Sequence, residues 1–422
     1  MNDAKLSPAA ELEHDDERGE VRPEAWGVRA TAEPRSFAPR AVEARPGEVL
    51  ARWPAAWEKI DPAAFIRLPE AVAGPEPATQ AQPSLARDRA LIVIPCLNEA
   101  PLIAQVIDRV LQDEGLVDPL VLVADGGSTD GSREIVARLA AQDHRIRLLP
   151  NPDRLQSAGV NLAARMLGEG RPWLVRVDAH ADYPPNYASA LIAEARRTGA
   201  SSVVVCMDTK GKGGFQKAVA AAQNSVLGAG GSAHRCAGRS GWVDHGHHAL
   251  FSLDAFEAVG GYDESFSHNE DAELDFRLTQ NGGRIWLTDQ VRIGYYPRSA
   301  PAPLAKQYFS YGKGRARTVL KHLQPLKVRQ AAPLAVAPAV LSLLAAPLFW
   351  PLAIPALVWA VAALGYGVAL AARKRDAALL MSGPAAMIMH LAWSAGFWKQ
   401  LFATVQARPA SPPSQGRKPV PA

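Results

Sequence analysis

The pattern of apolar and polar positions changes at residue 89. From there to residue 206, short apolar runs alternate with longer stretches in which apolar residues recur at helical spacing. The runs predict strands at residues 91–94, 120–124, 146–149, 173–177 and 202–206, and the stretches predict helices at residues 101–113, 131–142, 155–167 and 185–197. Because strands joined through a helix pair in parallel, this order predicts an open α/β sheet. Such sheets bind ligands beyond the carboxyl ends of their strands.

A long apolar region follows this domain. Residues 331–372 contain no charged side chain, and this length is about twice the roughly 20 residues that a helix needs to cross a bilayer. We predict a hairpin of two membrane spans there. Its turn is marked by three prolines, Pro347, Pro351 and Pro355. Residues 377–398 form a further apolar stretch that could cross the membrane, re-enter it or lie in the interface, and we favour a third span. Buried helices of a soluble core are the alternative.

Basic residues flank the predicted hairpin on both sides. Lys327 and Arg329 precede it, and Arg373, Lys374 and Arg375 follow it. The positive-inside rule places both flanks in the cytoplasm, as a hairpin requires. We therefore expect a protein of the inner, cytoplasmic membrane whose main folded domain faces the cytoplasm.

The two ends of the chain have the composition of disordered segments. Residues 1–88 are rich in Ala, Pro, Glu and Arg without a sustained period, although residues 50–72 could form a small docked helix. The last residues are rich in Pro and Ser. The predicted organisation is a mostly disordered extension at 1–88, an α/β domain at 89–330, a membrane segment of two or three helices at 331–402 and a disordered tail at 403–422.

Composition narrows the classes of function and the compartment. Lys and Arg total 46 and Asp and Glu total 42, a net charge of +4 that does not favour nucleic-acid binding. The three cysteines, Cys96, Cys206 and Cys236, are widely spaced and form neither a disulfide framework nor a CxxC metal pair. Acids near the N-terminus do not fit a secretory signal. We expect a reducing compartment.

Two predicted strands lead into polar loops that could bind a nucleotide. The first loop begins at Pro95, and its Asn98 and Glu99 could hydrogen-bond a base or ribose, although Asn98 could equally be a helix cap. The second loop begins at Asp125, which offers a carboxylate, and Gly126 in its glycine pair lets the backbone approach a ligand. A capped turn is the alternative for this loop, but it leaves the acid at the strand end unexplained.

A carboxylate and an imidazole follow the fourth predicted strand. Asp178 and His180 are two residues apart, so their side chains point the same way at a strand end. They could share a divalent ion that also holds a diphosphate. A surface ion pair between Arg176 and Asp178 is the alternative.

The densest cluster of acids opens a predicted helix within residues 268–278. Its four acids are Glu270, Asp271, Glu273 and Asp275. A helix dipole favours acids at the N-terminus, but capping does not account for the whole cluster. Three histidines lie just upstream, His245, His247 and His248. They could form a zinc site, but neither a partner cysteine nor an HExxH pattern accompanies them.

These elements, taken in order, resemble glycosyltransferase family 2, whose members have the GT-A fold. The resemblance covers residues 89–330 and lies in PCLNEA, DGGSTDGS, the DAH at 178–180 and HNEDAELDFRL. The segments DAHADYP and HNEDAELDFRL are most similar to the ExoA-like glucosyltransferases of succinoglycan-type exopolysaccharide synthesis, which also carry a C-terminal membrane segment. The resemblance implies an open, mixed, mainly parallel sheet with flanking helices, followed by transmembrane helices.

The resemblance also implies a role for each motif. The nucleotide-sugar pocket would be lined by Pro95, Asn98, Glu99, Asp125, Gly126 and Asp178. The metal, Mg2+ or Mn2+, would be held by Asp178 and His180, and the catalytic base would be Asp271. The acceptor and diphosphate region would contain His247, His248, Glu270, Gln307, Arg315 and Arg317. His180 stands where the family usually has the second acid of Asp-x-Asp. The Gln-x-x-Arg-Trp motif of processive members is absent, which argues against a cellulose-like polymerase.

The implied reaction is an inverting transfer of a sugar, with glucose from UDP-glucose favoured, to a lipid-linked saccharide. A divalent ion would stabilise the departing diphosphate while a carboxylate takes the acceptor's proton. Helical spacing places Asp271 and Asp275 on one face and sends Glu270 and Glu273 to other faces. The basic residues before the first span could hold a polyprenyl-diphosphate-linked acceptor, or they could be a solvated flank.

Two other functions stay open at this point. A sugar nucleotidyltransferase would also need acids and a nucleotide pocket, but it usually carries a glycine-rich basic signature after its first strand, and PCLNEA is not one. A membrane-tethered sugar-nucleotide-binding protein could keep the same fold without catalysis. Turnover of a nucleotide sugar would separate the enzyme from the binding protein.

Overall fold

The computed structural model describes residues 89–230, 239–247, 250–326 and 328–406. The predicted disorder at 1–88, the possible helix at 50–72 and the tail from residue 407 lie outside these residues.

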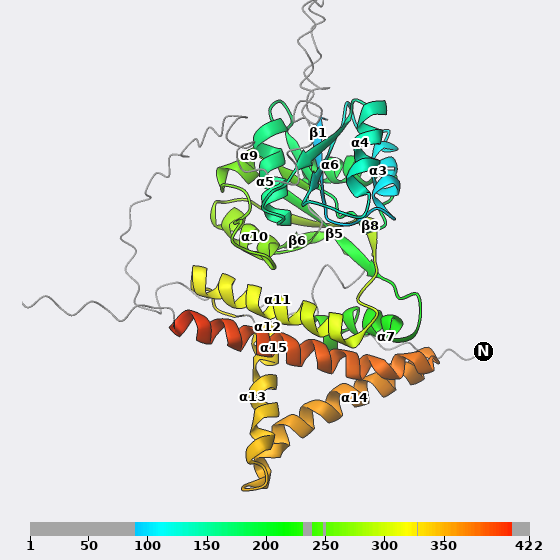
Figure 1. Cartoon of the computed structure of the whole chain (residues 1–422). Coiled ribbons are helices and arrows are strands. Elements are labelled where there is room, and N and C mark those ends of the chain that lie inside the picture. The colour runs from blue at the N-terminus through cyan, green and yellow to red at the C-terminus, as the bar shows by residue number, and fades with distance from the viewer. Residues whose placement is uncertain (1–88, 231–238, 248–249, 327, 407–422) are drawn as a thin grey trace, which may run out of the picture. The chain divides into compact units, whose positions relative to one another are not determined.

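An eight-stranded sheet forms the centre of the α/β domain (Figure 1), in the order β3-β2-β1-β4-β7-β5-β8-β6. The strands are β1 (Ala90–Cys96), β2 (Leu120–Asp125), β3 (Ile146–Pro150), β4 (Trp173–Arg176), β5 (Ser202–Thr209), β6 (Gly241–Val243), β7 (Leu250–Ser252) and β8 (Ile285–Tyr295). Strands β3, β2, β1 and β4 pair in parallel, and so do β5 and β8. Strand β7 is antiparallel to β4 and β5, and β6 is antiparallel to β8. The expected mixed, mainly parallel sheet is therefore confirmed.

Helices cover both faces of the sheet. The helices of this domain are α3 (Ile103–Leu111), α4 (Ser132–Gln142), α5 (Gln156–Leu167), α6 (Tyr187–Thr198), α7 (Gly214–Gln223), α8 (Val226–Ala229), α9 (Leu253–Ala258) and α10 (Glu270–Gln280). Ile92 and Ile94 of β1 pack with α3, α4 and α6, whereas Leu91 and Val93 pack with α5, α9 and α10. Burial on both faces explains why β1 has a continuous apolar run instead of an alternating one.

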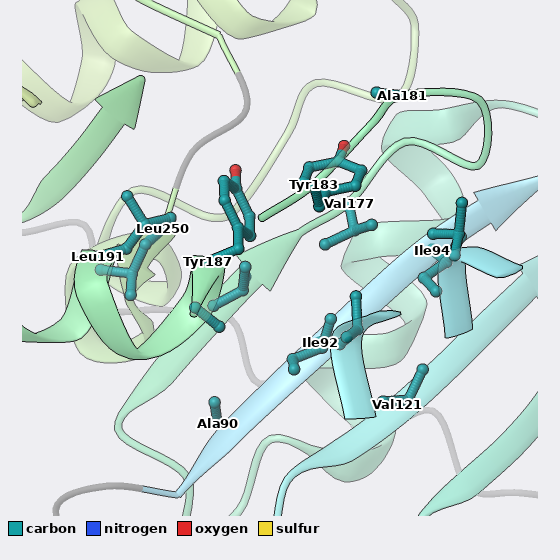
Figure 2. Close-up of a cluster of buried hydrophobic side chains, with 14 of the residues drawn as sticks. Ala90, Ile92, Ile94, Val121, Val177, Ala181, Tyr183, Tyr187, Leu191 and Leu250 are labelled. Carbon is teal, nitrogen blue, oxygen red and sulfur yellow. The ribbon is translucent and has the colours of Figure 1, made fainter. Parts of the chain in front are cut away.

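The hydrophobic core that contains Ile92 and Ile94 also includes two buried tyrosines, Tyr183 and Tyr187. Figure 2 shows Tyr183 and Tyr187 beside Val177 and Leu191, next to the isoleucines of β1. The two tyrosine rings are 4.7 Å apart in an edge-to-face arrangement. They fix the chain directly after β4, where the DAH motif lies.

The C-terminal region begins with α11 (Pro301–His322) and continues through a series of apolar helices. These are α12 (Val328–Ala331), η5 (Ala332–Ala335), α13 (Val336–Leu341), η6 (Ser342–Ala345), η7 (Trp350–Ala353), α14 (Ile354–Lys374), η8 (Ala377–Met381) and α15 (Ser382–Gln406). Two helical stretches, Trp350–Lys374 and Ala377–Gln406, are long and apolar enough to cross a membrane by length and composition. The first arm of the predicted hairpin is shorter, since its apolar helix covers Ala332–Ala345. The prediction of two membrane-long helices within residues 331–372 is therefore wrong for this arm.

Candidate active site

The loops after β1 and β2 interlock at the carboxyl edge of the sheet. The backbone N–H of Asn98 donates to Ser128 Oγ at 2.8 Å, and the N–H of Thr129 donates back to Asn98 Oδ1 at 2.9 Å. The N–H of Glu99 donates to Ser132 Oγ at 2.8 Å. Asn98 thus joins two loops instead of capping its own helix, and it holds Glu99 at the edge where a ligand would bind.

Asp125 organises the second of these loops from inside. Its side chain is 1% exposed, and its carboxylate accepts from the N–H of Gly127 at 2.9 Å and from the N–H of Ser128 at 3.0 Å. The hydroxyl of Ser128 also donates to it. The N–H of Gly126 donates to the carbonyl of Cys96 at 2.8 Å, and Gly127 has φ of +91°, which favours glycine. The acid at the strand end is therefore explained by the loop that it stabilises.

Arg176 is the centre of a buried cluster of charges. It is the last residue of β4 and is 6% exposed. Its guanidinium is 3.3 Å from Asp178 Oδ1, pairs with Asp271 and is 3.9 Å from Glu270 Oε1. Burial lowers the pKa of Arg176, but the charges of Asp271 and Asp178 outweigh it and raise that pKa well above the usual value. The alternative of a surface ion pair is therefore wrong, since the arginine joins the DAH motif to α10 inside the protein.

Asp271 lies in the first turn of α10 and is held by three donors. Arg176 and the hydroxyl of Tyr262, which is 3.0 Å away, donate to its Oδ1, and His247 Nδ1 lies 3.0 Å from its Oδ2. One turn later, Asp275 Oδ2 lies 2.7 Å from His245 Nδ1. The prediction that Asp271 and Asp275 share a face is confirmed. Each acid has a histidine partner, so these imidazoles are bound to carboxylates.

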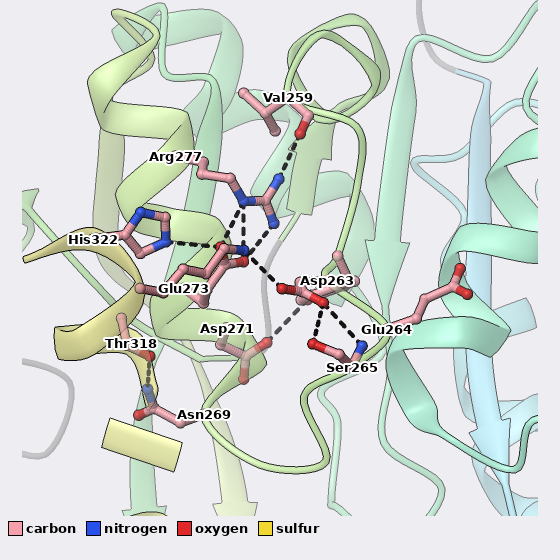
Figure 3. A network of polar contacts seen from close by, with 12 residues as sticks. Val259, Asp263, Glu264, Ser265, Asn269, Asp271, Glu273, Arg277, Thr318 and His322 are labelled. Atoms are coloured by element: carbon pink, nitrogen blue, oxygen red, sulfur yellow. Dashed lines mark hydrogen bonds and ion pairs between the residues drawn. The ribbon is translucent and has the colours of Figure 1, made fainter. Parts of the chain in front are cut away.

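The other two acids of the cluster take different directions. Glu270 lines the same cavity as Asp271, as expected of the acceptor and diphosphate region, so the inference from helical spacing that it points elsewhere is wrong. Glu273 does point away, into the polar network of Figure 3, where it is 2.6 Å from Arg277 and 2.9 Å from His322. Lys321 of α11 also reaches Glu273, at 2.6 Å. This network holds α10 against α11, while Glu270 and Asp271 line the cavity.

Burial and charge set the protonation of Glu270 and Asp271 in opposite directions. Burial acts to raise the pKa of Asp271, but Arg176 and His247 outweigh it and hold this pKa well below its usual range. Burial and the charge of Asp271 raise the pKa of Glu270 to about 7, against a smaller opposing effect of Arg176. Asp271 is therefore an anion at neutral pH, whereas Glu270 can exchange a proton there.

A cavity of about 1020 Å³ lies over these charges. One side is formed by the buried cluster, and another is formed by three residues of α15, Met389, His390 and Trp393. The remaining wall includes side chains of α11, among them Lys306, Gln307 and Arg315. The cavity therefore connects the acids at the sheet edge with the apolar C-terminal helices, and its walls combine carboxylates, cations and aromatic rings.

Asp178 and His180 form the part of the cavity nearest the nucleotide loops. His180 Nδ1 is 3.0 Å from Glu99 Oε1, so Glu99 fixes the imidazole, and this hydrogen bond raises the pKa of His180 against the effect of burial. Among the described residues, no group of three or more His, Cys, Asp or Glu side chains is placed to hold a metal ion. Magnesium and manganese sites that use one or two protein ligands are completed by phosphate oxygens and water. Asp178 supplies a carboxylate for that type of site, and His180 supplies a nitrogen donor where a second carboxylate would otherwise stand.

Sequence comparison bears directly on the identity of this site. Residues 91–260 match glycosyl transferase family 2. The chain is 54% identical over 311 residues to the succinoglycan biosynthesis protein ExoA of Rhizobium meliloti (strain 1021), across 74% of this chain and 94% of that protein. The chain belongs to glycosyltransferase family 2. It is a glycosyltransferase, and its mixed sheet with flanking helices is the GT-A-type fold of that family.

Solved structures with a similar arrangement are more distant from this family 2 glycosyltransferase. One is the mannosyltransferase PcManGT from Pyrobaculum calidifontis in complex with GDP-Man and Mn2+, with 21% identity, a TM-score of 0.49, and coverage of 75% of this chain and 88% of that one. Another is S. aureus TarS 1-349, with 12% identity, a TM-score of 0.40, and coverage of 74% and 91% respectively.

The structure brings most of the predicted site residues of this glycosyltransferase together. The predicted residues that line the cavity are Asp178, His180, His247, Glu270, Asp271, Gln307 and Arg315. The predicted nucleotide residues Pro95, Asn98, Asp125 and Gly126 build the adjoining loops, and Glu99 touches His180. Arg317 is turned away, because it donates to the carbonyl of Ser265 at 2.6 Å. His248 lies outside the described residues.

Three contributors to the glycosyltransferase site are not predicted from the sequence. The sequence suggests Arg176 only as a surface partner of Asp178. Gln156 of α5 lines the cavity with its amide against the Arg176 guanidinium, and Tyr262 donates to Asp271. The available signal is an arginine two residues before Asp178 of the DAH motif, at the end of an otherwise apolar strand, since an arginine there needs buried acids as partners.

Proposed function

We propose that this protein is an inverting, metal-dependent glucosyltransferase that moves glucose from UDP-glucose to a lipid-linked saccharide during succinoglycan-type exopolysaccharide synthesis. The observation that carries the proposal is the convergence of Asp178 and Asp271 on Arg176 in one cavity. A donor diphosphate at Asp178 and an acceptor hydroxyl at Asp271 would then lie next to each other in that cavity. The relative in Rhizobium meliloti, named as a succinoglycan biosynthesis protein, supports the pathway.

The donor side of the site is formed by the two interlocked loops and the DAH motif. Asn98 and Glu99 would contact the nucleoside, while Asp125 and Gly126 would act by shaping the loop. Asp178 and His180 would hold Mg2+ or Mn2+ together with diphosphate oxygens. A divalent ion bound there supplies positive charge that stabilises the departing nucleoside diphosphate. Glu99 would keep the His180 ring oriented through its contact with Nδ1.

Asp271 is the proposed base. Its position at the floor of the cavity lets it accept a hydrogen bond from the attacking hydroxyl, and its anionic state leaves it ready to take the proton. His247 and Tyr262 orient the carboxylate. Glu270 is the alternative base, because a pKa near neutrality suits proton transfer better than a strongly depressed one. Attack by the hydroxyl opposite the leaving group inverts the anomeric carbon in a single displacement.

The acceptor side of the cavity is bordered by α11 and α15. Lys306 and Arg315 provide positive charge, and Met389 and Trp393 provide apolar surface. This combination suits a saccharide attached to a lipid through a diphosphate, and a polyprenyl diphosphate is the proposed carrier. The apolar C-terminal helices support a location at the inner membrane, and the basic residues at the C-terminal end of α14 support a cytoplasmic orientation of the catalytic domain.

The decisive experiment incubates the full-length protein in membranes with a panel of nucleotide sugars and polyprenyl-diphosphate-linked saccharides. Glucose transfer from UDP-glucose is expected, and nuclear magnetic resonance of the product should show an anomeric configuration opposite to that of the donor. Donor binding without transfer to any acceptor would indicate a binding protein. Formation of the nucleotide sugar from a nucleoside triphosphate and a sugar phosphate would indicate a nucleotidyltransferase.

A further inference from the structure

The long apolar helix α15 is packed along α11 at very short distance. A Cβ atom at Gly312 of α11 would lie 2.0 Å from the carbonyl oxygen of Trp393, and a Cβ atom at Gly396 of α15 would lie 2.0 Å from that of Phe309. The two glycines therefore let the two backbones touch. Figure 1 shows the two helices side by side over much of their length. The orientation of α15 in a membrane thus follows that of α11.

Helix α11 is bound to the catalytic domain by polar contacts. Lys321 is 2.7 Å from Asp263, and Thr318 Oγ1 accepts from Asn269 Nδ2 at 2.8 Å. The helix also carries Lys306, Lys313 and Arg315. A helix with these charges is excluded from the hydrocarbon of a bilayer. Because α15 runs along α11, this packing opposes a membrane crossing by α15, although the length and composition of Ala377–Gln406 would allow one.

The hairpin that precedes α15 is pinned to it at the root. The N–H of Ala337 donates to Ser394 Oγ at 3.0 Å, and the carbonyl of Leu334 accepts from Trp398 Nε1 at 2.9 Å. From this root to the turn at Phe349 the first arm has about 12 residues, or about 18 Å at 1.5 Å per residue. The hydrocarbon core of a bilayer is about 30 Å thick. The first arm is therefore too short to reach the opposite side, and it limits the depth of the tip even though the stretch Trp350–Lys374 is long enough to cross on its own.

The free part of the hairpin is apolar and uncovered. Leu344 is 81% exposed, Leu348 is 91% exposed and Trp350 is 72% exposed. At the tip, Ser342 Oγ donates to the carbonyl of Leu352 at 2.7 Å, so the two arms are tied together. An exposed apolar surface of this kind is unfavourable in water and favourable in lipid.

We propose that residues 338–374 form a wedge that enters one leaflet from the cytoplasmic side and returns without crossing the bilayer, while α11 and α15 lie at the membrane surface. The occupant of the uncovered face is the acyl-chain region of that leaflet. Three basic residues, Arg373, Lys374 and Arg375, return the chain to the cytoplasmic headgroups. The wedge builds on the membrane location in the proposed function, and it places the cavity wall formed by Met389, His390 and Trp393 next to the leaflet.

The test is the accessibility of the tip in the full-length protein. Leu348→Cys is compared with Leu102→Cys, an exposed leucine of the catalytic domain, and wild-type labelling sets the background. A membrane-impermeant maleimide is applied to spheroplasts and to inside-out vesicles. We expect Leu102→Cys to be labelled only in inside-out vesicles, and we expect Leu348→Cys to remain at background in both. Labelling of Leu348→Cys in spheroplasts would overturn the wedge, because the tip of a crossing hairpin faces the periplasm.

Two further measurements test the wedge. A reporter fused after Ala422 should be cytoplasmic, and a periplasmic reading would indicate a crossing α15. A spin label at Leu344→Cys should relax faster with oxygen, which dissolves in lipid, than with a water-soluble nickel chelate, and the reverse would place the hairpin in water. Glucose transfer measured on the same membranes reports on the proposed activity separately, so a failed wedge and a failed enzymatic assignment are distinguishable.

Discussion

Arg176 and Asp271 are paired in the buried floor of the cavity although 95 residues separate them in the sequence. The pair joins the end of a central strand to the first turn of α10. It brings together the side of the site assigned to the donor and the side assigned to the acceptor. Its removal should therefore affect both folding and catalysis.

We expect Arg176→Met to lower the free energy of unfolding by about 3–5 kcal/mol, because it leaves Asp271 and Asp178 buried without their cation. The measurement is denaturant unfolding of the full-length protein in detergent. Arg165→Met is the matched control, since Arg165 is 52% exposed and pairs with Glu264 at the surface. Its expected cost is about 0–1 kcal/mol. Equal losses in the two variants would contradict the central role of Arg176.

We expect Asp271→Asn to bind UDP-glucose within a few-fold of wild type and to lose turnover by about 100-fold or more, because the amide keeps the shape but cannot take the proton. Donor binding and kcat are measured separately. Asp263→Asn, which alters a carboxylate paired with Lys321 outside the cavity, should retain turnover. Weak donor binding with normal turnover would assign Asp271 to the nucleotide or metal instead.

The variant Glu270→Gln tests the acid next to Asp271 through the pH dependence of stability. The pKa of the Glu270 carboxyl is 4.5 in the unfolded chain and about 7 in the folded chain, so the folded state binds the proton more tightly. The stabilisation that comes from this tighter proton binding is fully present below pH 4.5 and is lost as the pH rises through about 7. At pH 8, Glu270→Gln should therefore raise the melting temperature, and Glu264→Gln should not. If Glu270 is the base, the variant should also lose turnover about 100-fold at every pH.

Activity should require a divalent ion. Excess EDTA should abolish glucose transfer, and Mg2+ or Mn2+ should restore it. His180→Asp should retain transfer with a changed preference between the two ions, because a carboxylate replaces the imidazole at the same position. His144→Ala, at an imidazole that is 84% exposed, should leave metal dependence unchanged. Full activity in excess EDTA would show that Asp178 and His180 do not hold a metal ion that the transfer requires.

The contact between α11 and α15 is open to a steric test. Gly312→Ala should lower stability by about 1–3 kcal/mol, since the new Cβ would meet the carbonyl of Trp393. Gly365→Ala of α14 is the control, because nothing lies within 4 Å of its Cβ position and alanine favours a helix. Thermal unfolding in detergent compares them. An unchanged Gly312→Ala variant would mean that the two helices separate easily.

Much of the fold could be predicted from the apolar runs alone, because strands buried on both faces stand out from the helices between them. The order of the strands could not, since β7 inserts between β4 and β5 only through contacts between distant segments. Strands β6 and β7 have only three residues each, so their apolar signal is weak. The membrane region shows a related limit, since hydropathy gives the length of an apolar helix but not the helix on which it packs.

The candidate site was predictable where one short segment contains the relevant spacing. Asp271 and Asp275 are four residues apart on one helix, so their common face follows from helical geometry. Helical spacing separates Glu270 from Asp271, yet both line the cavity, because the first residue of a helix is positioned by the chain that precedes it as much as by helical spacing. Arg176 could not be assigned for a different reason, since its partners lie on another element and only the folded sheet brings them together.

The cavity wall formed by α15 has a kinetic consequence. A soluble enzyme meets its acceptor at a volume concentration, whereas the proposed lipid-linked acceptor, held in the leaflet beside Met389 and Trp393, would meet the cavity by lateral diffusion in two dimensions. The quantity that governs the rate is then the mole fraction of acceptor among the lipids. Diluting the membranes in buffer would leave turnover unchanged, while adding inert lipid to the same membranes would slow it.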